Sequence, residues 1–173
     1  MRVMVAIDDS EESFYALNWA LDNLFRDMGA PPEASGGGGG SEVVPPTLLL
    51  VNVQQALQHY GVPIGPVGGA VFYPTVTVTE SVKKAQEQTS ATILSRALQM
   101  CKDKMVITEA LSLNGNPKDE ICQAIEQKHA DLLIVGSRGL GKIKRAFLGS
   151  VSNYCAHHAK CPVLIVKSPK DHE

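Results

Sequence analysis

The chain has 173 residues, 44% of them hydrophobic and 20% charged, which is the profile of one globular domain with a substantial core. Its net charge of −2 and pI of about 6.2 argue against general binding to nucleic acid or to an anionic membrane, because both require a broad positive surface. No apolar run approaches the length that crosses a membrane.

The N-terminus and the cysteines favour an intracellular protein. The acidic pair Asp8-Asp9 comes too early for a secretory leader. Four cysteines without a CxxC pair favour reduced, buried thiols: Cys101, Cys122, Cys155 and Cys161. We expect a cytoplasmic protein, with a nuclear location left open.

The chain opens with a short apolar strand at Val3–Ile7. Asp9 or Ser10 can cap a helix whose apolar positions recur at helical spacing and whose end is predicted near Gly29. Asp8 therefore lies at the carboxyl end of the first strand. It can help to cap the helix, or it can accept hydrogen bonds from a ribose.

Two segments of the N-terminal half carry no regular pattern. Residues 30–46 contain an unbroken glycine run between prolines, and residues 54–79 are rich in glycine and proline. We interpret both as flexible surface insertions in a single domain that spans residues 1–173. Between them, Thr47–Val53 is predicted to be a second buried strand.

The middle of the chain predicts two more helices and a strand. Apolar residues at helical spacing predict a helix over Glu80–Lys104, and Met105–Leu113 reads as a strand with one less buried side. Asn116 is a suitable N-cap for the next helix, which runs to about Lys128.

The C-terminal part combines strands with a basic turn. The run Leu132–Val135 predicts a strand buried on both faces, a helix begins at Ser150, and Pro162–Val166 supplies the last strand. This alternation predicts a doubly wound α/β fold with five parallel strands in the order 3-2-1-4-5 and helices on both faces. Its switch point would lie between the first and fourth strands, where Asp8 and Gly136 border one crevice.

The turn after the fourth strand has the composition of a phosphate site. Two residues separate Gly136 from Gly139, and nine more separate Gly139 from Gly149-Ser150. Glycines let the backbone approach phosphate oxygens, and the N–H groups of Val151 and Ser152 at a helix start can bind the same anion. Four basic residues accompany these glycines: Arg138, Lys142, Lys144 and Arg145. The alternative is a set of ordinary turns with a solvated basic face.

Other chemistry has weaker support in the sequence. The first seven positions of a P-loop are matched from Gly136 to Lys142, but Ile143 occupies the position that needs a hydroxyl for Mg²⁺. The segment from Cys155 to Cys161 contains two histidines without the spacing of a zinc site. No nucleophile elbow or acid–base pair is evident, so no catalytic residue is assigned.

These residues carry a family resemblance. The pattern from Gly136 to Ser150 is similar to the ATP-binding signature of universal stress proteins, and Val3–Ser10 resembles the first strand and ribose-binding turn of that family. The similarity is strongest to plant members. It implies an adenine nucleotide alpha hydrolase-like, Rossmann-like fold with ATP or AMP as ligand, and Mg²⁺ as an optional companion.

The resemblance also implies roles for individual positions. Ala6, Ile7 and Asp8 would line the adenosine pocket, with Asp8 on the ribose, and Val53 would offer backbone groups to the adenine. The other implied residues would wall the pocket or hold phosphate: Val135, Gly136, Arg138, Gly139, Gly149, Ser150, Val151 and Ser152. A homodimer through the last strand, Pro162–Val166, is also implied.

We therefore expect a nucleotide-binding stress-response sensor or regulator with slow ATP hydrolysis at most. The alternative is a chaperone-like or protein-interaction module whose nucleotide pocket is vestigial. A nucleotide-dependent enzyme is a third hypothesis, which requires a clear turnover rate.

Overall fold

The protein is built around a parallel sheet. The computed structural model describes residues 1–26, 46–55, 62–63, 71–72, 76–138 and 148–169. In these residues the strands of the main sheet are arranged β5-β2-β1-β6-β7, and every neighbouring pair is parallel. The strands are β1 (Arg2–Ala6), β2 (Thr47–Gln55), β5 (Thr108–Gly115), β6 (Leu132–Gly136) and β7 (Val163–Val166). The predicted fold class and the order 3-2-1-4-5 are confirmed.

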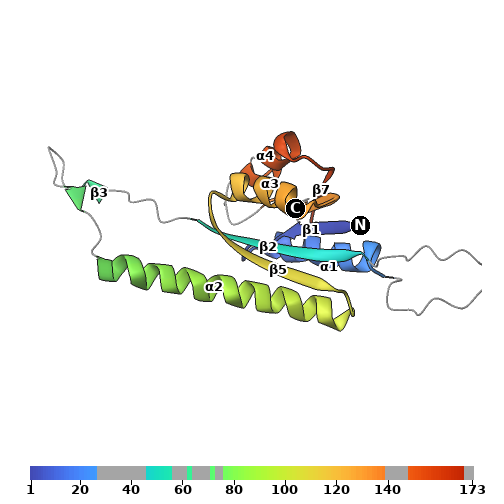
Figure 1. Ribbon diagram of the computed structural model, residues 1–173, viewed down its shortest axis with the longest axis horizontal. Helices are drawn as coiled ribbons and strands as arrows, with labels where there is room; N and C mark the ends of the chain where they lie inside the picture. Colours follow the sequence, from blue (N-terminus) through green and yellow to red (C-terminus); the bar gives the residue numbers. More distant parts are fainter. Residues whose placement is uncertain (27–45, 56–61, 64–70, 73–75, 139–147, 170–173) are drawn as a thin grey trace, which may run out of the picture.

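Two layers of helices cover the sheet (Figure 1). Alternate residues of β1 point to opposite faces, so that Val3 and Val5 join one apolar cluster and Met4 joins the other. The first cluster is completed by α1 (Glu11–Leu24) and α2 (Val76–Asp103). The second is completed by α3 (Pro117–Lys128) and α4 (Ser150–His158). The central strands are therefore buried on both faces.

Two helix starts follow the predicted caps. The Ser10 hydroxyl accepts a hydrogen bond from the Ser13 amide, and the Asn116 side chain accepts one from the Lys118 amide. α1 ends at Leu24, before the predicted end near Gly29. Residues beyond Arg26 in that segment lie outside the described part of the chain, as does most of the predicted insertion at 30–46.

The segment 54–79, predicted as a flexible surface excursion, contains some regular structure. β2 continues to Gln55, and two short strands, β3 (Val62–Pro63) and β4 (Val71–Phe72), pair antiparallel. α2 begins at Val76, four residues before the predicted start at Glu80. Its first four residues are all β-branched. Such residues have low helix propensity, so the sequence alone does not indicate that the helix starts here.

The turn between α2 and β5 also differs from the prediction. The strand was expected from Met105, but Met105 has a left-handed backbone (φ 55°) in a tight turn, and β5 begins at Thr108. Backbone bonds from the Met105 and Val106 amides to the carbonyls of Lys102 and Cys101 close this turn. β5 lies at one edge of the sheet and is only half-buried, as its partial alternation predicts.

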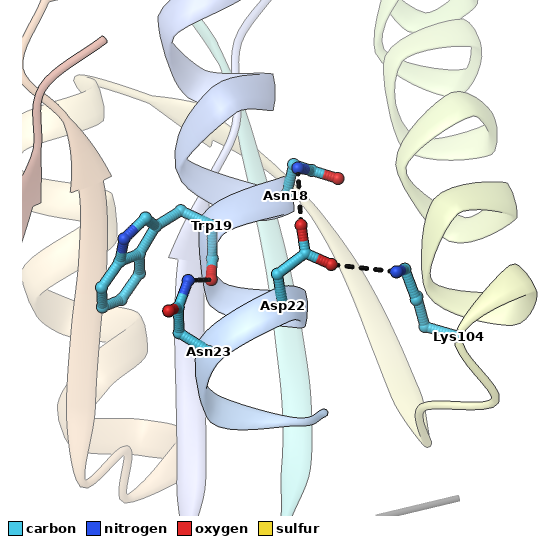
Figure 2. Close-up of polar contacts among 5 residues, drawn as sticks. All are labelled: Asn18, Trp19, Asp22, Asn23 and Lys104. Carbon is cyan, nitrogen blue, oxygen red and sulfur yellow. Dashed lines mark hydrogen bonds and ion pairs between the residues drawn. The ribbon is translucent and has the colours of Figure 1, made fainter. Parts of the chain in front are cut away.

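An exposed ion pair links the ends of α1 and α2. The Asp22 carboxylate lies 2.9 Å from the Lys104 ammonium and accepts a second hydrogen bond from Asn18 (Figure 2). In the same turn of α1 the Asn23 side chain donates to the Trp19 carbonyl (Figure 2). None of the helices in the described residues is both long and apolar enough to cross a membrane.

Candidate nucleotide site

The switch point of the sheet lies between β1 and β6. These strands are parallel neighbours, but β1 leads into α1 on one face, whereas β6 leads toward α4 on the other. The two connections therefore separate at the carboxyl ends of the strands, which is where doubly wound proteins bind ligands.

The turn after β1 holds Asp8 in a fixed network. One carboxylate oxygen, Oδ1, accepts hydrogen bonds from the Ser10 amide at 3.0 Å and from the Ser10 hydroxyl. The Ser13 hydroxyl lies 2.9 Å from the Asp8 carbonyl oxygen and 3.3 Å from its amide nitrogen. Among the described residues nothing binds the second oxygen, Oδ2. Asp8 is therefore oriented by its own turn while one acceptor remains for a hydroxyl group.

The end of β2 faces the same crevice. The Val51 carbonyl accepts a bond from the Ile7 amide, and the backbone groups of Val53 point to that same side because they alternate along a strand. β1 has ended by this level, since its last pair is Ala6 with Val51. The N–H and C=O of Val53 are consequently directed beyond the end of β1, where the edge of a base could meet them.

Asn52 is a site residue that sequence reasoning missed. It is only 5% exposed, and its side-chain amide donates to the Ile7 carbonyl at 2.8 Å. This bond fixes the backbone between β1 and Asp8 to β2. A polar residue inside the run Thr47–Val53 was the available signal, because buried polar groups need a partner.

The β6 side of the crevice depends on Gly136. A Cβ atom on this residue would lie 3.0 Å from the backbone carbon and oxygen of Glu12 in the first turn of α1. Gly136 also pairs with Val166 of β7, and the Ser137 amide donates to the Val166 carbonyl. The missing side chain thus lets α1 approach the end of β6, and so brings the Asp8 turn close to the β6 turn.

Gly149 joins the β6 turn to the start of α4. Its amide donates to the Ser137 carbonyl at 2.8 Å, and a Cβ atom here would lie 3.3 Å from the Cα of Arg138. The buried Ser152 hydroxyl lies within hydrogen-bond distance of the Ser137 and Gly149 carbonyls. α4 has no side-chain cap at its N-terminus. The amides of its first turn, including those of exposed Ser150 and half-buried Val151, are available as potential anion donors.

Other predicted site residues have different positions. The side chains of Ile7 and Val135 are both 3% exposed and lie in the two opposite apolar clusters, so only their backbones can face a ligand. Ala6 and Arg138 are half-buried. Residues 139–147 lie outside the described residues; they include Gly139, the P-loop positions from Gly139 to Ile143 and the basic residues Lys142, Lys144 and Arg145.

The donor and acceptor groups of this crevice fit a nucleotide. The β1 side offers a half-buried carboxylate and strand-end backbone groups, which suit ribose and a base. The β6 side offers a close glycine turn and an uncapped helix start, which suit a phosphate. Two surface hollows of the described residues, of about 400 and 430 Å³, lie elsewhere, against Lys104 and Tyr154.

The alternative metal ligands do not converge. His157 and His158 are exposed, whereas Cys155 is fully buried. In the part of the chain that the structure describes, no three side chains of histidine, cysteine, aspartate or glutamate are placed to hold a metal ion.

Comparison with known proteins identifies relatives of this chain. The chain is 42% identical over 79 residues to a universal stress protein A-like protein of Arabidopsis thaliana, which covers 46% of this chain and 45% of that one. It is 29% identical to the Arabidopsis thaliana universal stress protein PHOS34, over 99% of this chain and 64% of the relative. The chain thus spans about half to two thirds of the length of these relatives.

A solved structure shares the fold. It is a universal stress protein family protein from Arabidopsis thaliana with AMP bound, 24% identical, with a TM-score of 0.64 over 99% of this chain and 94% of that one. The model of the universal stress protein family matches residues 66–167, which is more than half of the chain and includes the β6–α4 turn. The chain therefore belongs to the universal stress protein family.

Proposed function

We propose that this protein binds an adenine nucleotide, AMP or ATP, in the crevice between β1 and β6, and acts as a sensor or regulator in a cytoplasmic stress response. The observation that most supports the proposal is the approach of α1 to Gly136, because it brings the turn that holds Asp8 close to the end of β6, from which the chain continues to the uncapped start of α4. The structural neighbour with bound AMP supports the class of ligand.

In this proposal each side of the crevice has its own task. Asp8 Oδ2 accepts from ribose hydroxyls, the backbone of Val53 meets the adenine edge, and the amides of Ser150 to Ser152 hold phosphate. Gly139 and Arg138 would complete the phosphate end. Bound Mg²⁺ would neutralise phosphate charge, and the described residues supply no cluster of carboxylates for it.

Titration calorimetry with AMP, ADP and ATP, each with and without Mg²⁺, tests the site. Asp8→Asn keeps an oxygen for Ser10 but removes the charge, and the loss of a charge-assisted bond should weaken binding about tenfold or more. Asp9→Asn is the matched control, because Asp9 is the exposed neighbour. Equal nucleotide affinities for wild type and Asp8→Asn would show that Asp8 does not bind the ribose.

A second variant separates the phosphate end from the ribose end. Ser150→Asp places a negative charge in the first turn of α4, which favours the helix but repels phosphate. It should weaken binding of AMP and ATP while leaving adenosine binding unchanged. Asn153→Asp, one turn later and also exposed, adds the same charge as a control. The vestigial-pocket alternative predicts no measurable nucleotide binding by any of these proteins.

We further propose that β7 pairs with β7 of a second copy to form a homodimer. β7 is an edge strand whose Pro162 and Val166 carbonyls bond to the β6 side, so the backbone of Val163 and Ile165 faces outward. Ile165→Pro removes an outward amide without breaking the β6–β7 ladder. Light scattering should then report a monomer, with wild type as the dimer. A dimer of unchanged affinity would place the interface elsewhere.

A further inference from the structure

Three of the four cysteines gather on one face of the sheet. Cys155 of α4 lies in the apolar cluster beneath α3 and α4, and Cys122 of α3 and Cys161 before β7 pack against that cluster. Cys101 belongs to the cluster on the opposite face. All four thiols are free. The nucleotide site uses none of them.

Solvent accessibility distinguishes Cys122 from Cys155. Cys122 is half-buried and lines a surface hollow of about 430 Å³ between α3 and α4, together with Tyr154, Asp119, Gln123 and Glu126. Cys155 has no exposed surface. A small solute in the hollow can therefore meet Cys122 but cannot meet Cys155 directly.

Cys155 is the thiol that interacts most directly with Cys122, since each of the two influences the pKa of the other. Cys161 interacts with both thiols through charge alone, and it also lies near the Leu133 backbone and Asp131 at the amino end of β6. The outer thiol thus has an inner thiol directly behind it, on a separate helix. Two thiols of one cluster, carried by the neighbouring helices α3 and α4, are the arrangement from which an interhelical disulfide can form.

We propose that Cys122 and Cys155 are an oxidisable pair, in which Cys122 reacts with a small neutral hydroperoxide and the product is a disulfide that links α3 to α4. The carboxylates of Asp119 and Glu126 line the hollow, so a neutral oxidant enters it more readily than an anionic one.

The chemistry is balanced in two steps. The Cys122 thiolate attacks one peroxide oxygen, the O–O bond breaks, and the sulfur is oxidised to a sulfenic acid while the other oxygen leaves and takes up a proton. The Cys155 sulfur then attacks the sulfenic sulfur, the S–O bond breaks, and the leaving hydroxide takes the Cys155 proton as water. Two thiols and one hydrogen peroxide thus become one disulfide and two waters.

The environment of the two thiols should make their oxidation slow. Burial, with the charges of Asp119 and Glu126, raises the pKa of the Cys122 thiol. Burial and the neighbouring Cys122 raise the pKa of Cys155 to about 12. Because the thiolate is the reactive form, the pair should respond to sustained oxidant and resist a brief exposure.

Peptide mapping of the reduced full chain, treated with hydrogen peroxide and then alkylated, tests the proposal. Trypsin puts the cysteines in four separate peptides: 97–102, 119–128, 146–160 and 161–167. We expect a cross-linked species of 119–128 with 146–160 that disappears on reduction. A cross-link to 161–167, a cross-link only between chains, or alkylation of Cys122 undiminished after prolonged exposure would overturn the proposal.

Variants test the order of the two steps. Cys122→Ser should abolish the cross-link and leave Cys155 reduced. Cys155→Ala should stop the reaction at a sulfenic acid on Cys122, which a dimedone adduct would report. Cys101→Ser and Cys161→Ser are controls that should retain the cross-link. Wild-type mapping keeps the test valid if the buried Cys155 variant fails to fold, and sulfenic acid first at Cys155 would refute the assigned order.

Discussion

The two sides of the switch point are built by different means. The β1 side is held by side chains, since Asp8, Ser10 and Ser13 bind one another and cap α1. The β6 side is held by backbone contact, because Gly136 has no side chain to separate it from Glu12. Side-chain bonds can be lost one at a time at modest cost, whereas a steric contact between two backbones leaves no room to adjust. The β6 side should therefore be the less tolerant of substitution.

The largest effect is expected for Gly136→Ala. The new methyl group would meet backbone atoms of Glu12 at 3.0 Å, and overpacking of this kind costs about 1–3 kcal/mol. The reduced freedom of the unfolded chain offsets about 0.4–1 kcal/mol of that cost. Urea unfolding should show a net loss of about 1–2 kcal/mol.

Gly149→Ala makes the same chemical change with nearest contacts of 3.3 and 3.4 Å. It should cost less than Gly136→Ala, although alanine is also a poorer N-cap than glycine. If Gly136→Ala were as stable as wild type, α1 would not be in close contact with β6, and the steric account of that side would be wrong.

An intermediate effect is expected on the β1 side for Ser10→Ala. The variant removes the acceptor for the Ser13 amide and a donor to Asp8, and loss of such a cap costs about 1 kcal/mol. Asp9→Ala is the neighbouring control and should be nearly neutral. A loss for Ser10→Ala larger than that for Gly136→Ala would reverse the comparison between the two sides.

The sequence predicts the β1 side better than the β6 side for a physical reason. Asp8 and Ser10 act within a few residues of one another, so local cap chemistry identifies them. Gly136 is recognisable as a glycine, but its contact with Glu12 joins segments more than a hundred residues apart. Asn52 was missed because its partner, the Ile7 carbonyl, lies just after another strand, 45 residues away in the sequence.

The sheet order is an exception among long-range features. It was predicted correctly because alternation of strands and helices, with right-handed crossovers, leaves few topologies. The start of α2 at Val76 was not predicted, since its β-branched residues oppose helix formation and the context of the fold overrides that preference. Positions within 139–147, including Gly139, remain predictions.

The smallest effect is expected at the far end of α1, where Asp22 contacts Lys104 in solvent (Figure 2). The hydrogen bond from Lys104, then its charge and the Asn18 bond, hold the pKa of Asp22 below its usual value. A lowered carboxylate pKa stabilises the folded state above the unfolded pKa, and the contribution is lost as the pH falls through the folded pKa. Solvent screening makes this contribution small.

Asp22→Asn should therefore lower the urea midpoint slightly at neutral pH, by less than Ser10→Ala, and the difference from wild type should shrink as the pH falls through the lowered pKa of Asp22. Lys104→Gln is the matched control, because it removes the partner and should abolish the same pH-dependent difference. A difference that persists unchanged in acid would mean that Asp22 acts through packing rather than charge. A difference exceeding that of Ser10→Ala would show that α1 is held mainly at its solvent-exposed end, and not at the crevice.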